Sequence, residues 1–89
     1  MKSFDCKVIG RVQGVGYRYF IASLAEDLGL KGWVKNSTNG SVQIMVQGDV
    51  DLVETFLYHA KQGSAYAKVE QIITSEVFVD EFFEFKIQR

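Results

Sequence analysis

The spacing of apolar residues changes from one period to another within a single stretch, Gly10-Arg11-Val12-Gln13-Gly14-Val15-Gly16-Tyr17-Arg18. Before it, residues 4–12 alternate between apolar and polar side chains, which is typical of a half-buried strand. After it, residues 18–29 place apolar side chains at helical spacing, and Gly29 can end that helix in the left-handed conformation. The stretch therefore joins a strand to the N-terminus of a helix, and its glycines allow a tight turn between them.

The patterns that follow predict three or four further strands and one more helix. Residues 31–36 and 41–47 have the character of strands, and Asn39-Gly40 between them is a strong hairpin signal. Asp49 can cap a second helix, which Gly63 can end. The last two apolar runs, residues 67–79 and 83–87, again indicate strands.

This order of elements is the split βαβ arrangement known as the ferredoxin-like βαββαβ sandwich, an α+β fold. We expect residues 1–89 to form one such domain, with an antiparallel sheet of four to five strands and two helices on one face. A right-handed crossover places the first two strands parallel, with the third between them. The carboxyl ends of those two strands then share one sheet edge, which brings the loop Gln13–Arg18 to roughly 10 Å from Asn36.

The composition limits the partners that this chain can have. Its formal net charge is −1, with 10 basic and 11 acidic residues scattered along the sequence, whereas a general nucleic-acid binder carries a basic face. No apolar run approaches the ~20 residues that span a bilayer, and the N-terminus lacks a secretory signal pattern. Cys6 is the only cysteine, so no internal disulfide forms. We expect a cytoplasmic protein with no nucleic-acid or membrane partner.

The glycine loop followed by Arg18 predicts a phosphate-binding site. The first N–H groups of a helix have no intrahelical partners, and together with the helix dipole they attract an anion. Arg18 adds a permanent charge with a planar set of donors. The glycine spacing matches neither the dinucleotide fingerprint nor a P-loop. In a plainer interpretation, the glycines form an ordinary turn and the stem of Arg18 covers apolar surface.

Few other residues at this sheet edge can contribute chemistry. Asn36 has a neutral amide that can hold a water molecule, although asparagine is also common in turns. We expect His59 to face solvent on the second helix and Cys6 to pack in the core; one residue of each type cannot form a zinc site. Trp33 and Tyr17 could stack a base, but packing is the favoured interpretation.

Taken together, these residues resemble the acylphosphatase family. One matching stretch is the glycine loop quoted above, and the other is Gly32-Trp33-Val34-Lys35-Asn36-Ser37-Thr38-Asn39-Gly40-Ser41-Val42, followed by Gly48. The terminal Phe83-Glu84-Phe85-Lys86-Ile87 also resembles the closing strand of the family. The loop Gly63-Ser64-Ala65-Tyr66-Ala67 departs from it, because it lacks the prolines often found there.

The resemblance implies hydrolysis of the carboxyl–phosphate bond of small acyl phosphates to a carboxylate and inorganic phosphate, with no metal or other cofactor. It further implies two catalytic residues, Arg18 to bind the phosphoryl group and Asn36 to orient the attacking water. The loop residues whose main-chain amides would complete the phosphate site are Gln13, Gly14, Val15, Gly16 and Tyr17. An acyl phosphate carries a good leaving group, so positioning and charge stabilisation suffice. We expect a phosphate oxygen of the substrate to accept the proton of the water.

Two other functions remain as alternatives. A single-stranded RNA-binding module shares this fold, and Lys31-Gly32-Trp33-Val34 faintly echoes its signature, but the net charge disfavours it. A sensor that binds acyl or carbamoyl phosphate without hydrolysing it is disfavoured by the intact pair of Arg18 and Asn36. We expect a monomer, although Phe78, Phe82 and Phe83 leave room for a weak dimer.

Overall fold

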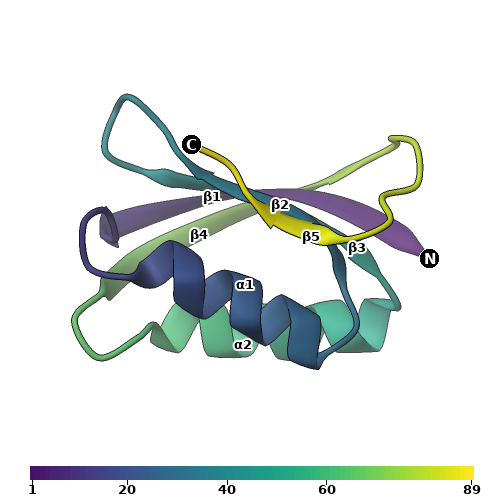
Figure 1. Ribbon diagram of the computed structural model, residues 1–89, viewed down its shortest axis with the longest axis horizontal. Helices are drawn as coiled ribbons and strands as arrows, with labels where there is room; N and C mark the ends of the chain where they lie inside the picture. Colours follow the sequence, from purple (N-terminus) through teal and green to yellow (C-terminus); the bar gives the residue numbers. More distant parts are fainter.

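The protein, represented by a computed structural model, is described over all 89 residues. Five strands and two helices follow one another in the expected order (Figure 1). Their bounds are β1 Lys2–Arg11, α1 Tyr17–Asp27, β2 Lys31–Asn36, β3 Val42–Gly48, α2 Val50–Gln62, β4 Lys68–Val77 and β5 Phe85–Ile87.

The strands form one sheet in the order β4-β1-β3-β2-β5. Because β3 pairs antiparallel with both β1 and β2, those two strands run parallel with β3 between them, as expected. The loop after β1 and the hairpin after β2 therefore lie at the same end of the molecule, on the left of Figure 1. The sheet is not antiparallel throughout, however, because β5 pairs parallel with β2.

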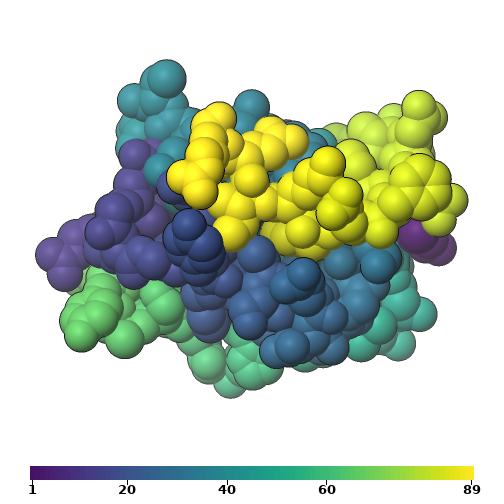
Figure 2. Space-filling model, viewed as in Figure 1, coloured from purple at the N-terminus to yellow at the C-terminus, as the bar shows by residue number.

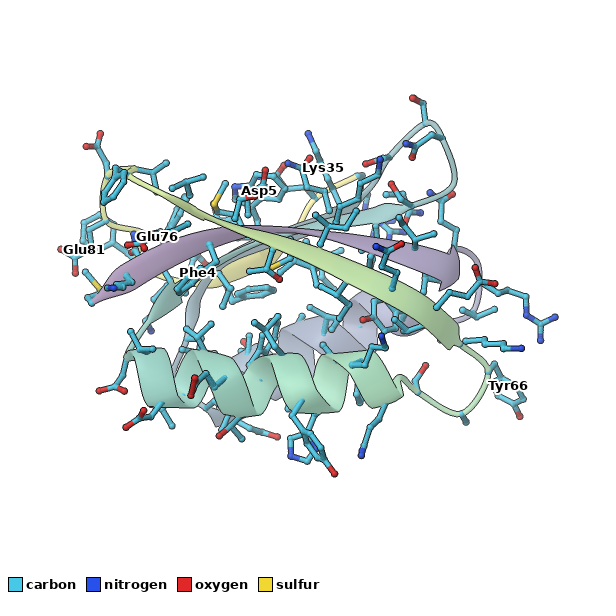
Figure 3. The ribbon with its side chains drawn as sticks, turned by 180° about the vertical axis from the view of Figure 1, so that it is seen from behind. Phe4, Asp5, Lys35, Tyr66, Glu76 and Glu81 are labelled. Atoms are coloured by element: carbon cyan, nitrogen blue, oxygen red, sulfur yellow. The ribbon has the colours of Figure 1, made fainter.

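Both helices cover one face of the sheet, and the core lies between the two layers. Figure 3 shows Phe4 directed toward the helices, whereas Asp5 and Lys35 project from the open face. The expected apolar stripes are confirmed: Ile21 and Ala25 of α1 and Val53, Phe56 and Ala60 of α2 are buried. None of the helices combines the length and the apolar composition needed to cross a membrane.

The helix ends follow the capping signals in the sequence. The Asp49 carboxylate accepts a hydrogen bond from the Asp51 N–H at 2.9 Å, which confirms it as the cap of α2. After α1, Gly29 has φ 70°, and the Leu30 N–H donates to the Ala25 carbonyl at 2.8 Å. This left-handed ending stops the regular helix at Asp27, two residues before the expected limit.

The two last strands are shorter than expected, because their apolar alternation continues into a loop. Strand β4 ends at Val77 rather than at residue 79, and β5 begins at Phe85 rather than at residue 83. The intervening residues include Phe78 and Phe83, whose side chains are 92% and 83% exposed. Alternation alone cannot distinguish such exposed aromatic residues from those of a strand face.

A buried amide anchors this β4–β5 connection. Gln47 of β3 is 2% exposed, and its Nε2 donates to the Ser3 hydroxyl at 2.8 Å and to the Asp80 carbonyl at 3.2 Å. Its Oε1 accepts a hydrogen bond from the Phe82 N–H at 2.8 Å. The connection that leads into β5 is therefore fixed to the central sheet by one satisfied side chain.

We expect Gln47→Leu to lower the free energy of unfolding by about 1–3 kcal/mol, because it removes three hydrogen bonds and leaves the buried Ser3 hydroxyl and the half-buried Phe82 N–H without this partner. Urea denaturation measures this value. Gln43→Leu is the matched control: Gln43 lies on the same face of β3, is half-buried and makes one bond, to the Asp5 carboxylate at 3.0 Å. Equal losses of unfolding free energy in the two variants would show that the three hydrogen bonds of Gln47 contribute no more than the single hydrogen bond of Gln43.

Candidate functional site

The turn between β1 and α1 requires glycine at two positions. Gly14 and Gly16 have φ values of 73° and 79°, in the left-handed region that other residues avoid. A Cβ atom at either position would meet no atom within 4 Å, so the constraint is the backbone conformation and not a lack of space. The space next to Gly14 and Gly16 is therefore free of protein atoms and open to solvent.

Helix α1 starts at this turn without a side-chain cap. Its N-cap residue is Gly16, which has no side chain that could accept a hydrogen bond from the helix N–H groups. No acidic residue occupies the first turn. The first helical bond runs from the Phe20 N–H to the Gly16 carbonyl at 3.1 Å. The preceding N–H groups of the turn are left without helical acceptors, and together with the helix dipole they favour an anion.

Arg18 is held at the site by the C-terminal segment. Its Nη1 donates to the Gln88 carbonyl at 2.9 Å, and the Gln88 N–H donates to the Val34 carbonyl of β2 at 2.8 Å. Figure 2 shows the C-terminal residues, in yellow, lying against the dark blue start of α1. Arg18 takes part in neither of the two salt bridges of the structure. Its charge is therefore positioned but not neutralised.

Gln13 ties the loop to the neighbouring hairpin. Its side-chain Nε2 donates to the carbonyls of Ser37 and Ser41 at 2.7 and 2.8 Å. Both acceptors belong to the β2–β3 hairpin, which begins directly after Asn36. Sequence reasoning placed only the main-chain amide of Gln13 at the site and missed the role of its side chain. The shared sheet edge was the available signal, but nothing in the sequence identifies two main-chain carbonyls as its acceptors.

Asn36 is the exposed last residue of β2, opposite Val42 of β3. Its amide has no hydrogen-bond partner within the protein, whereas the nearby Asn39 uses its Oδ1 to bind the Ser41 N–H at 3.1 Å and the Ser41 hydroxyl at 2.6 Å. Asn39 thus shapes the hairpin, as its sequence signal indicated, and the Asn36 amide is left free. A free neutral amide can both donate to and accept from a water molecule.

A shallow pocket of about 160 Å³ lies at the glycine turn. Its lining residues are Val12, Gly14, Gly16, Tyr17, Arg18 and Tyr19. The structure therefore brings Arg18 together with both glycines, whereas Asn36 does not line this pocket. Gln13 connects the loop to Ser37, the residue that follows Asn36. A larger hollow of about 460 Å³ lies at the opposite end. Its carboxylates, Glu76, Asp80 and Glu81, outnumber the positive charges of Lys2 and the N-terminus, and Lys2 is paired with Glu76 at 3.9 Å, so this hollow disfavours an anion.

The other candidates have structural roles. Cys6 is fully buried, and burial raises the pKa of its thiol to about 11, so it is not a thiolate near neutral pH. Tyr17 is buried as well, with its hydroxyl donating to the Ala60 carbonyl at 2.8 Å; burial raises the pKa of this phenol. His59 is exposed on α2, as expected. Nowhere do three or more His, Cys, Asp or Glu side chains gather as a metal-binding group would.

Comparison with known proteins assigns the family. A family model described as Acylphosphatase matches residues 4–87. The acylphosphatase of Treponema denticola is 42% identical over 88 residues, which cover 99% of this chain and 94% of that relative. The crystal structure of acylphosphatase from Bacillus subtilis has a TM-score of 0.97 at 37% identity, with 100% of both chains covered. An acylphosphatase structure from Coxiella burnetii has a TM-score of 0.93 at 30% identity and covers 98% of this chain and 92% of that one. By sequence and by fold, this chain belongs to the acylphosphatase family.

Proposed function

We propose that this protein hydrolyses the carboxyl–phosphate bond of small acyl phosphates and releases a carboxylate and inorganic phosphate. The observation that carries the proposal is the pocket at the start of α1, where uncapped N–H groups and the unneutralised charge of Arg18 converge. Such a pocket suits a compact anion with several acceptor oxygens. Membership of the acylphosphatase family supports the same substrate class.

In this proposal, the main-chain N–H groups from Gln13 to Tyr17 bind the phosphoryl oxygens. Arg18 adds its charge: the Gln88 carbonyl occupies one donor of the guanidinium, and the remaining donors stay available for the substrate. A cation at a helix N-terminus is unfavourable by about 0.3–1 kcal/mol, and a bound dianion reverses that sign. Binding and charge stabilisation thus come from the same few groups.

We assign the attacking water to Asn36, whose amide is free and which ends β2 at the same sheet edge as the loop after β1. Gln13 keeps the hairpin that follows Asn36 at a fixed place relative to the phosphate loop. In phosphoryl transfer the attacking and leaving oxygens lie roughly in line with phosphorus. Two rigidly connected loops can hold the water and the phosphoryl group in that arrangement.

The reaction balances without a protein nucleophile. The water oxygen attacks phosphorus, the bond between phosphorus and the acyl oxygen breaks, and the carboxylate leaves with the electron pair. A phosphate oxygen of the substrate accepts the proton of the water. No histidine, cysteine or carboxylate side chain lines the pocket, which favours this substrate-assisted route.

We further propose that the chain acts as a cytoplasmic monomer of one domain, without a cofactor and with no nucleic-acid or membrane partner. Its near-neutral net charge of −1 and its single, buried cysteine support this assignment. Measuring the activity in the presence of a chelator tests the independence from metal ions, and we expect the activity to be unchanged.

Arg18→Ala should abolish both phosphate binding and turnover of benzoyl phosphate in the presence of EDTA. Asn36→Ala should reduce kcat by about 10²–10³-fold, the effect of one well-placed hydrogen-bonding group, while the inhibition constant of inorganic phosphate stays nearly constant. Steady-state kinetics with phosphate as competitive inhibitor measures both quantities. The matched control is Arg11→Ala, because Arg11 is an exposed arginine at the end of β1 that does not line the pocket.

A variant Asn36→Ala that loses phosphate affinity but keeps kcat contradicts the assignment of the water to Asn36. Phosphate binding without turnover of any acyl phosphate by the wild-type protein identifies a sensor rather than an enzyme.

Gln13→Ala should lower kcat by about 10–100-fold while phosphate affinity is retained, because the main-chain donors remain but the hairpin carrying Asn36 is released. Gln13→Glu should not rescue the rate, since a carboxylate cannot donate to the two carbonyls. Gln43→Ala serves as the control, because its one hydrogen bond lies on the open face of the sheet. A loss of phosphate affinity equal to the loss of kcat would place the Gln13 side chain in phosphate binding instead.

A further inference from the structure

The pocket has one exposed aromatic side chain at its rim, that of Tyr19. Tyr19 is 61% exposed and follows Arg18 in the first turn of α1. Successive helical residues are 100° apart, so Tyr19 is turned about 200° from Tyr17, which is buried in the core. Core packing therefore explains Tyr17 but not Tyr19, whose hydroxyl has no hydrogen-bond partner in the protein and whose ring joins none of the aromatic pairs.

The size of the pocket leaves the acyl group of a substrate outside it. At about 160 Å³ it is well below the ~300–1,000 Å³ of sites that enclose a whole small molecule. It suits the phosphoryl group, and the remainder of the substrate must cross the rim. Gly14 and Gly16 offer no side chain there, Val12 and Tyr17 are buried, and Arg18 is bound to Gln88.

The direction of the acyl group follows from the in-line geometry. A water held by Asn36 approaches phosphorus from the sheet layer, so the leaving carboxylate lies on the opposite side of the phosphoryl group. The first turn of α1 belongs to the helix layer, which lies below the sheet layer that contains β2 (Figure 1). Tyr19 lines the pocket from that helix, whereas Asn36 does not line it.

We propose that Tyr19 contacts the acyl group and determines acyl specificity, so that the enzyme favours acyl phosphates with an aromatic or otherwise flat apolar acyl group. This inference rests on the proposed function. A tyrosine ring offers a rigid apolar face for such a group, and stacked aromatic pairs gain affinity beyond the area they bury. Acetyl phosphate carries only a methyl group on its acyl carbon, so it has no ring that could stack on the Tyr19 side chain.

The test compares kcat/KM for benzoyl phosphate with kcat/KM for acetyl phosphate in matched variants. In Tyr19→Ala the benzoyl-to-acetyl ratio should fall about three- to tenfold, the size expected for one aromatic contact. Tyr19→Phe should keep the wild-type ratio, because it retains the ring face. Tyr58→Ala is the control, since Tyr58 is equally exposed at 63% but lies on α2. Competitive inhibition by benzoate, relative to acetate, should weaken in parallel.

An unchanged ratio in Tyr19→Ala, with both substrates hydrolysed, overturns the role of Tyr19 and leaves the proposed function intact. A ratio that falls equally in Tyr58→Ala also overturns it. If the wild-type protein hydrolyses neither substrate, the proposed function fails, and the inference fails with it.

Discussion

Two glycine residues in the left-handed conformation turn the chain from β1 into α1, and the candidate site depends on this turn. Gly14 and Gly16 hold positive φ angles in a loop that leaves the first N–H groups of α1 without partners. A side-chain cap would have satisfied those donors and made the helix start more stable. The chain instead keeps an electropositive helix end open and places Arg18 in its first turn. Free donors and a local excess of positive charge are the two features that favour an anion at a helix N-terminus.

Three separated parts of the chain hold that site in place. The C-terminal segment fixes Arg18 through the Gln88 carbonyl, and the β2–β3 hairpin accepts two hydrogen bonds from Gln13. The C-terminal segment is itself positioned through β5, whose preceding connection is anchored by Gln47 at the other end of the sheet. Figure 3 shows Glu81 of that connection far from Tyr66, which lies at the end of the molecule near the hairpin. Geometry at the site therefore depends on hydrogen bonds made along the whole sheet.

The sequence was sufficient to predict the features that arise from local or periodic patterns. The order of elements, the parallel placement of β1 and β2, the Asp49 cap and the burial of Cys6 are all confirmed. Alternation of period two and helical spacing determine which faces are buried, and the handedness of crossovers restricts the topology. The same patterns predict that the glycine turn and Arg18 lie at one sheet edge, which the topology confirms.

The contacts that sequence reasoning missed are long-range and end on main-chain groups. Gln13 reaches the carbonyls of Ser37 and Ser41, Arg18 reaches that of Gln88, and Gln47 binds the main chain at Asp80 and Phe82. Every residue has the same main-chain carbonyl group, so neither residue type nor periodicity indicates which carbonyl will accept a hydrogen bond from a distant side chain. The parallel pairing of β5 with β2 was not predicted either, because the pattern of a three-residue strand is too short to indicate its direction.

The proposed hydrolysis requires that the glycine loop and the start of α1 form a phosphate site. Its most direct test is a titration of the ¹⁵N-labelled protein with inorganic phosphate, followed residue by residue in amide correlation spectra. We expect saturable shifts that are largest for the amides from Gln13 to Tyr17 and for the Arg18 guanidinium, with small shifts around Gln47. Shifts that do not saturate, or that are spread over the lysines of the open sheet face while the loop amides stay unchanged, would contradict it.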